Sequence, residues 1–218
     1  MAELKTHYLG LELKNPIIVG ASNLVTDHET LKKIEEAGAG AIVYKSLFEE
    51  QIQLERAQQD DFKDVYGERH AEMITIFPDI EHAGPAEFLL NFKKALEVVN
   101  IPVIASLNCV YDVTWTEYAK KLEEAGAAAI ELNFYANPRD AATKGKEIVE
   151  QQLAILKKVK QTVKIPVSVK LSPFYSNILA VISEMDKTGV DGFVLFNRLF
   201  QPDIDIEKEE MVLPWHLS

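Results

Sequence analysis

The stretch Ile165-Pro166-Val167-Ser168-Val169-Lys170-Leu171 decides the fold prediction. Its alternate residues from Val167 onward are apolar, prolines bound it, and a helical pattern precedes it, so it is typical of a short buried strand. Lys170, near the end of this strand, is anomalous because an ammonium is rarely buried without a partner. Either Lys170 extends to the surface or pairs with a carboxylate, or it lies at the rim of a barrel and faces an anionic ligand or cofactor.

Two helix-to-strand junctions recur along the chain. Residues 35–43, 123–132 and 187–196 each combine a helix end and a glycine with an apolar strand. Residues 100–105 and 164–169 share a second pattern, in which Ile-Pro precedes the strand. The repeating unit is therefore a helix followed by a strand, which indicates an alternating α/β fold with a parallel sheet.

This repeat predicts a sheet of six strands, introduced by a small hairpin at residues 8–16. The expected strands lie near residues 17–20, 41–44, 103–107, 128–133, 167–171 and 192–197. The expected helices lie near residues 28–37, 85–99, 113–125, 146–162 and 175–188, and residues 46–82 are expected to form a surface excursion.

The fold class is α/β, and the short loops favour a TIM (β/α)8-type barrel over an open doubly wound sheet. No G-x-G-x-x-G motif follows a strand, which weakens the dinucleotide-binding alternative. Only about six βα units are visible, whereas such barrels usually need about 250 residues. The acidic stretch at residues 203–210 is expected to be a surface loop. We expect one domain over residues 1–218, completed either by a longer protein or by another chain.

Composition excludes several classes of partner. The net charge of −11 argues against nucleic acid and anionic membranes. The single cysteine, Cys109, rules out an intrachain disulfide. No apolar run reaches membrane-spanning length, and the charged residues 1–5 do not resemble a signal peptide. We therefore expect a cytoplasmic protein with a small-molecule substrate, and leave open a homodimer.

In such barrels, the chemistry lies where the strands end. These positions carry two lysines, an arginine and several amides and hydroxyls, but no acid pair and no histidine cluster. The set suits a polar, partly anionic, planar ligand and does not suit metal hydrolysis or glycoside cleavage. Individually, the asparagines could instead tie loop backbone, Cys109 could be a small buried hydrophobe, and the glutamate-rich helices could be solvated faces.

In their order and spacing, several motifs together resemble the class 1 dihydroorotate dehydrogenases, FMN enzymes on a (β/α)8 barrel. The motifs are residues 8–16, Ala21-Ser22, Lys45-Ser46, Glu131-Leu132-Asn133, Val169-Lys170-Leu171 and Phe196-Asn197. The resemblance implies that FMN is contacted by Ala21, Ser22, Lys45, Ser46, Ser106, Asn108, Asn133 and Lys170. It implies that Lys45, Asn133 and Asn197 also face the substrate. Lys170 would balance the negative charge that arrives on the flavin with a hydride.

The chain departs from this family's pattern in its loops. Ala136 stands where the family carries a cysteine as general base, and alanine cannot accept a proton. His82 and Ala83 stand near the place of a substrate-binding asparagine, and Asn137-Pro138 reverses the family's order. Tyr135 and His82 are therefore the candidate bases, with His82 also a candidate substrate contact. The family's FMN phosphate site would lie on a seventh and eighth strand.

Three functions remain open from the sequence. The leading hypothesis is an FMN-dependent oxidoreductase acting on a CH–CH bond, with Lys45, Lys170 and Tyr135 as catalytic residues and with pyrimidine biosynthesis as the context of the family. The second is a Schiff-base aldolase using Lys170 as nucleophile. The third is a barrel that binds flavin or a protein partner without catalysis.

Overall fold

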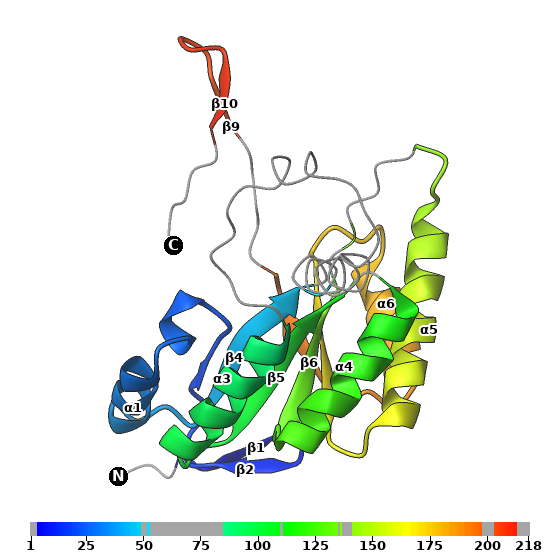
Figure 1. Ribbon diagram of the computed structural model, residues 1–218. Coiled ribbons are helices and arrows are strands. Elements are labelled where there is room, and N and C mark those ends of the chain that lie inside the picture. The colour runs from blue at the N-terminus through cyan, green and yellow to red at the C-terminus, as the bar shows by residue number, and fades with distance from the viewer. Residues whose placement is uncertain are drawn as a thin grey trace, which may run out of the picture.

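The core of the protein is a curved parallel sheet (Figure 1). The computed structural model describes residues 4–48, 52, 85–109, 111–134, 136, 141–197 and 203–212. Six strands follow each other in chain order across the sheet, each parallel to the next. They are β3 (Ile18–Val19), β4 (Ala41–Phe48), β5 (Val103–Asn108), β6 (Ala129–Asn133), β7 (Val167–Leu171) and β8 (Gly192–Leu195).

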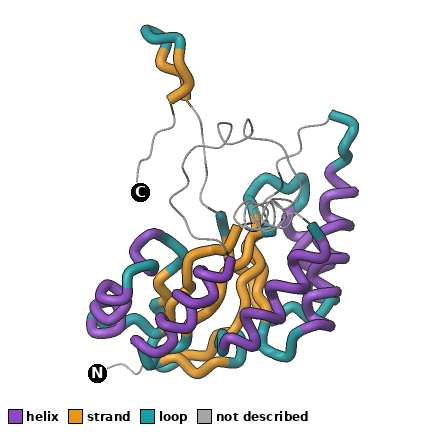
Figure 2. Tube along the Cα trace, viewed as in Figure 1, coloured by secondary structure: helices purple, strands orange, loops and turns teal. Residues whose placement is uncertain are grey.

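Helices connect successive strands and cover the outer face of the sheet (Figures 1 and 2). A half-barrel results, as the alternating repeat predicts. Apolar residues at helical spacing pack against the outward side chains of the strands in one large core. The helices are α1 (His28–Glu36), α3 (Pro85–Val98), α4 (Asp112–Ala125), α5 (Gly145–Thr162) and α6 (Ile178–Asp186).

Most observed boundaries lie close to the expected ones, with three informative differences. Strand β4 runs to Phe48, four residues beyond its expected end, so that Lys45 and Ser46 lie within the strand and not after it. Helix α6 begins at Ile178 and not near residue 175, because the Asn177 side chain accepts a hydrogen bond from the Ala180 N–H and fixes the N-cap. The acidic stretch expected as a surface loop instead forms an antiparallel hairpin of β9 (Asp203–Asp205) and β10 (Glu210–Val212). That expectation was wrong.

The N-terminal hairpin closes the lower end of the half-barrel in Figure 1. It pairs β1 (Thr6–Tyr8) with β2 (Leu11–Leu13) through a turn at Leu9 and Gly10, both at positive φ. Leu9 is buried with Val43, Ile104 and Ala129 in a small cluster of its own. These four side chains form the apolar floor of the barrel interior.

Three carboxylates hold together the junctions between helices and strands. Glu35 at the end of α1 accepts a hydrogen bond from the backbone N–H of Asn100, and Glu123 near the end of α4 accepts one from Lys164. Asp191 does the same for the N–H of Val167. The two glutamates occupy the same place in the sequence repeat, and each accepts a backbone hydrogen bond from the segment before the next strand.

Gly40 offers a direct test of the packing at one such junction. A Cβ added there would collide with the backbone oxygen of Asn15, and Gly40 itself donates to the carbonyl of Ile17 at 2.8 Å. Because backbone cannot yield as a flexible side chain does, Gly40→Ala is expected to destabilise the protein by about 1–3 kcal/mol. Gly145→Ala is the matched control, since a Cβ added at Gly145 would meet no other atom within 4 Å. The urea concentration at the unfolding midpoint should be lower for Gly40→Ala than for Gly145→Ala. Equal midpoints would show that the added Cβ at Gly40 does not clash.

No helix in the described part of the chain is long and apolar enough to cross a membrane. The expected surface excursion at residues 46–82 was wrong for residues 46–48, which belong to β4. Apart from residue 52, the rest of this stretch lies outside the described residues, so it stays a prediction.

Candidate active site

Polar residues fill the inner face of the sheet above the apolar floor. Side chains alternate between the two faces of a strand, so residues two positions beyond the floor residues face inward again. On β5 and β6 these are Ser106 and Glu131, which lie opposite each other in the ladder. Glu131 in turn lies opposite Ser168 on β7. Two residues further along the same strands, Asn133 lies opposite Lys170.

Strand β4 carries an irregularity at the level of this polar layer. Its pairing with β5 shifts between Tyr44 and Leu47, so that two residues, Lys45 and Ser46, occupy the space opposite Ser106. Such a bulge re-aims side chains and is frequent beside active sites. The bulge brings the Ser46 hydroxyl within 2.7 Å of the Ser106 hydroxyl, and the half-buried Lys45 precedes Ser46 in the carboxyl-terminal half of the strand.

Four of these residues form a connected group, which we call the inner polar cluster: Ser46, Ser106, Glu131 and Lys170. The hydroxyl oxygens of Ser46 and Ser106 lie 2.7 Å apart, and Ser106 donates to the Glu131 carboxylate at 3.3 Å. The Lys170 ammonium lies 4.0 Å from the same carboxylate oxygen. Both charged side chains are largely removed from solvent, with exposed fractions of 19% for Lys170 and 4% for Glu131.

Burial controls the ionisation of the Glu131 carboxyl. It raises the pKa of Glu131 above its usual value, although the charge of Lys170 and the hydrogen bond from Ser106 each lower it. Tyr8 approaches from below the cluster. Burial raises the pKa of its phenol, its hydrogen bond to Ser168 lowers that pKa, and the charge of Glu131 raises it.

Three predicted asparagines lie at the carboxyl ends of the strands. The side-chain oxygen of Asn133 is buried and has no hydrogen-bond partner among the described residues. Asn197 donates weakly to the Phe134 carbonyl at 3.5 Å, and half-buried Asn108 ends β5. A buried acceptor without a donor is costly, so the Asn133 amide suits a ligand that offers an N–H or O–H.

The remaining predicted residues lie apart from the cluster or outside the described residues. Ser22 is exposed and accepts a hydrogen bond from the Leu24 N–H, which caps a short 3-10 helix, η1 (Asn23–Val25). Its neighbour Ala21 packs against the apolar floor. Tyr135 and His82 lie outside the described residues, so their roles stay predictions.

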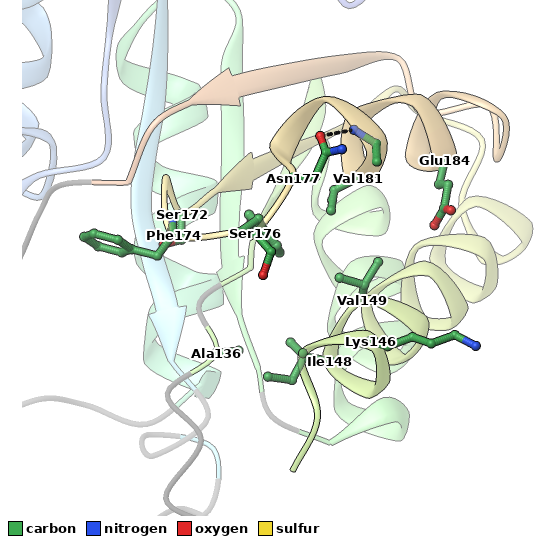
Figure 3. Close-up of a pocket in the computed structure, with 13 residues that line it drawn as sticks. Ala136, Lys146, Ile148, Val149, Ser172, Phe174, Ser176, Asn177, Val181 and Glu184 are labelled. Atoms are coloured by element: carbon green, nitrogen blue, oxygen red, sulfur yellow. Dashed lines mark hydrogen bonds between the residues drawn. The ribbon is translucent and has the colours of Figure 1, made fainter. Parts of the chain in front are cut away.

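A pocket of about 600 Å³ opens beside the strand ends, between α5, α6 and the loop after β7 (Figure 3). Ala136, which stands at the position of the family's cysteine base, is the described residue of the loop after β6 that lines its wall. Apolar side chains such as Val149 and Val181 line it together with Ser176. Since the inner polar cluster contributes no residue to this wall, the pocket is not the site that the strand ends predict.

Glu131 is the residue that the strand-end rule passes over. It lies in mid-strand, within Ala129-Ile130-Glu131-Leu132, and the set of residues at strand ends contains no acid. The usable signal was its alternation with Asn133, which places a carboxylate on the inner face, where a charge requires a partner. The pairing of Lys170 with a carboxylate, one of the two interpretations of that lysine, is confirmed by this geometry.

No group of three or more potential metal ligands from histidine, cysteine, aspartate and glutamate occurs within the described ranges. The polar groups of the inner cluster and the asparagines beside it are an ammonium, hydroxyls, amides and one carboxylate. Together they can bind and polarise an organic ligand, and hold a proton at the carboxylate.

Comparison with known proteins identifies the family of the chain. A family model described as dihydroorotate dehydrogenase matches residues 3–215. The catalytic subunit of dihydroorotate dehydrogenase B (NAD(+)) from Methanocaldococcus jannaschii is 29% identical over 221 residues, covering 96% of this chain and 67% of that protein. The corresponding subunit from Methanocella arvoryzae is 32% identical over 203 residues, covering 90% of this chain and 62% of that protein. The chain thus spans about two thirds of the length of these relatives.

Solved structures with similar folds are more distant. Phosphonopyruvate hydrolase in complex with oxalate and Mg++ superposes with a TM-score of 0.54 at 15% identity, covering 84% of this chain and 59% of that one. A 2,3-dimethylmalate lyase of the PEP mutase/isocitrate lyase superfamily reaches 0.52 at 13% identity, covering 82% and 58%. At such identities the likeness concerns the fold alone. The family model, which spans nearly the whole chain, goes further and confirms the resemblance seen in the sequence motifs: the chain belongs to the dihydroorotate dehydrogenase family.

Proposed function

We propose that the chain binds FMN at the carboxyl ends of β4 to β7 and acts as an oxidoreductase on a CH–CH unit of a small polar substrate. FMN supplies the hydride-accepting chemistry. The observation that carries the proposal is the arrangement of Lys170 and Asn133 side by side on neighbouring strands, an ammonium next to a buried amide oxygen that lacks a donor among the described residues. A flavin ring offers both an edge that becomes anionic and a ring N–H.

Each residue of the inner face has a proposed role. Lys170 holds a positive charge where negative charge develops, which is the strongest kind of electrostatic assistance in a water-poor site. Asn133 accepts from the ring and, with Lys45 and Asn197, orients the substrate. The backbone around Ala21, together with the hydroxyls or amides of Ser22, Ser46, Ser106 and Asn108, would complete the contacts to FMN.

The proton acceptor is the open part of the proposed chemistry. Ala136 is exposed in the loop after β6 and offers no group that takes a proton. Tyr135 and His82 are the proposed replacements, with His82 also proposed as a substrate contact. The names of the relatives make dihydroorotate, an intermediate of pyrimidine biosynthesis, the first substrate to assay.

Two alternatives to the FMN oxidoreductase, an aldolase and a flavin-binding protein without catalysis, can be distinguished from it by experiment. A Schiff-base aldolase would use Lys170 as its nucleophile, and borohydride trapping with a carbonyl compound, followed by mass spectrometry, distinguishes it from the flavin enzyme. A flavin-binding protein without catalysis is favoured by one observation, the alanine at position 136. Bound FMN with no turnover of dihydroorotate or related substrates would support this second candidate.

Titration of the purified chain with FMN, followed by flavin fluorescence, tests the proposal, and absence of binding would overturn it. Asn133→Ala is expected to weaken FMN binding up to about tenfold, because a neutral hydrogen bond contributes roughly 0.5–1.5 kcal/mol. Asn100→Ala is the matched control, since Asn100 is exposed before the start of β5, at the far end of the sheet. Equal dissociation constants for the two variants would remove Asn133 from the binding site.

A further inference from the structure

Glu131 is an acid enclosed within the barrel interior. Its residue exposure is 3%, and its neighbours across the ladder are Ser106 on β5 and Ser168 on β7. Ser106 donates to the carboxylate at 3.3 Å. This carboxylate is not among the groups assigned to FMN or to the substrate above, so its presence in the cluster requires its own explanation.

Two titratable groups face Glu131 among the described residues around it. Lys170 on β7 approaches to 4.0 Å, and the Tyr8 phenol on β1 interacts with its charge from below. Strand β5 contributes the non-titratable Ser106, and Gly192 on β8 lies opposite Ser168. Among the described lysines, which include Lys45 on β4, Lys170 is the one whose charge lowers the pKa of Glu131.

The distance between the Lys170 ammonium and the Glu131 carboxylate allows the protonation of Glu131 to change when another charge approaches. At 4.0 Å the ammonium does not donate a hydrogen bond to the carboxylate, so the pair lacks the geometry that fully compensates two buried charges. Burial already shifts Glu131 toward its protonated form, as its raised pKa indicates. An added negative charge near Lys170 would compete with the carboxylate for that ammonium and shift Glu131 further in the same direction.

A hydroxyl chain connects Glu131 with the bulge in β4. Ser46 and Ser106 lie 2.7 Å apart, and Ser106 contacts the carboxylate. Hydroxyls both donate and accept, so this chain can pass a proton to the carboxylate and reverse its hydrogen bonds afterwards. Ser46 lies in the bulge next to Lys45, close to where a ligand at the strand ends would lie.

We propose that Glu131 takes up one proton from solvent when negative charge is placed against Lys170, which makes it the positioning residue that sets the charge around that ammonium. The inference rests on the proposed binding of FMN. Two-electron reduction of FMN by a hydride adds one negative charge to the ring. One proton on Glu131 converts its carboxylate to the neutral acid, so the summed charge of Lys170, Glu131 and the ring is unchanged.

Glu131→Gln tests this with the flavin midpoint potential, measured by dye equilibration with dithionite as reductant. Glutamine cannot ionise, so in the variant no carboxylate charge at position 131 offsets the charge of Lys170. Above the titration of Glu131, its affinity for reduced relative to oxidised FMN should exceed that of the wild type by tenfold or more, which is about 30 mV for a two-electron couple. The two potentials should converge as the pH falls. A gap that does not change with pH overturns the proposal.

Glu131→Asp keeps a carboxyl group at this position. Its flavin midpoint potential should therefore regain the pH dependence that the glutamine variant loses. In wild-type protein with ¹³C-labelled glutamate, reduction should produce a carboxylic C=O infrared band that carries the isotope shift. This measurement needs no variant, so a Glu131→Gln protein that fails to fold does not prevent the test. Absence of the band overturns the proposal.

A ligand-free measurement separates failure of this inference from failure of FMN binding. The pKa of the Glu131 carboxyl is raised in the folded chain above its usual value of 4.5. As the pH rises above 4.5, the unfolded chain releases this proton first while the folded chain still holds it, so the free energy of unfolding falls across that window. The Glu131→Gln chain should lose less stability over the same range in urea unfolding. If no FMN binds but the wild type loses more stability with pH than Glu131→Gln, only the proposed function fails. If stability depends on pH in the same way in both proteins, Glu131 does not titrate as proposed.

Discussion

A chain with methionine in place of Lys170 is expected to bind FMN roughly ten- to a hundredfold more weakly than the wild-type chain. Lys170 lies near the end of β7, with 19% of its side chain exposed. A hydrogen bond to a charged group contributes about 1.5–3 kcal/mol, and each 1.4 kcal/mol is about tenfold in affinity. Fluorescence titration with FMN measures this loss directly.

The same substitution is expected to affect flavin reduction more than flavin binding. Removing one preorganised group that faces a developing charge typically slows the chemical step by roughly 10²–10³. Stopped-flow reduction at saturating FMN separates this step from binding. Reduction at the wild-type rate would contradict the role proposed for Lys170, even if affinity had fallen.

Lys170→Met also removes the ammonium whose charge lowers the pKa of Glu131. The remaining carboxylate is buried without that counter-charge. We expect this to cost about 1–3 kcal/mol at neutral pH, less than the roughly 3–5 kcal/mol typical of a broken buried pair, because the two charges are 4.0 Å apart and Lys170 is 19% exposed. The double variant Lys170→Met with Glu131→Gln removes the carboxylate charge as well and should recover part of the stability. A double-mutant cycle from urea unfolding measures the coupling; additive losses would mean that the two side chains do not interact.

Lys157→Met is the matched control for the lysine substitution. Lys157 is exposed on α5, and surface substitutions away from special features usually change stability by less than about 0.5 kcal/mol. It should leave FMN binding unchanged. A comparable loss in both variants would point to the net charge of the chain and not to the position of Lys170.

The sequence predicts the strands well because apolar residues on their outer face alternate with different residues on their inner face. Val167, Val169 and Leu171 pack outward against the helices, so an apolar alternation bounded by prolines was enough to predict β7 with its observed limits. The start of α6 was less predictable, because the competition between a helix after Pro173 and the Asn177 cap is decided by a local side-chain hydrogen bond.

The site was predicted only as far as the rule for strand ends reaches. That rule selects Lys170 and Asn133, which the ladder indeed places side by side. It does not select Glu131, whose importance depends on curvature that brings three strands around one interior. The bulge that presents Ser46 to Ser106 was equally invisible, since an extra residue in one strand appears only when the pairing register is known.

Replacing Trp115 with alanine is expected to produce the largest loss of stability, about 3–5 kcal/mol. Trp115 lies on α4 with 2% exposure and meets the Phe134 ring edge-on, with centroids 5.3 Å apart. Phe134 directly follows Asn133 at the end of β6, so this contact fixes where the loop leaves the sheet. Urea unfolding should show the loss, and Val113→Ala on the same helix, where Val113 is 70% exposed, should show almost none.

Trp115→Phe separates packing from hydrogen bonding at this position. The indole nitrogen is buried and has no hydrogen-bond partner among the described residues, so removing it also removes an unsatisfied donor. The variant should therefore lose much less stability than Trp115→Ala, on the order of 1–2 kcal/mol, because phenylalanine keeps most of the ring contact. If both variants were equally unstable, the contribution of Trp115 would come from its N–H and not from the ring that supports β6.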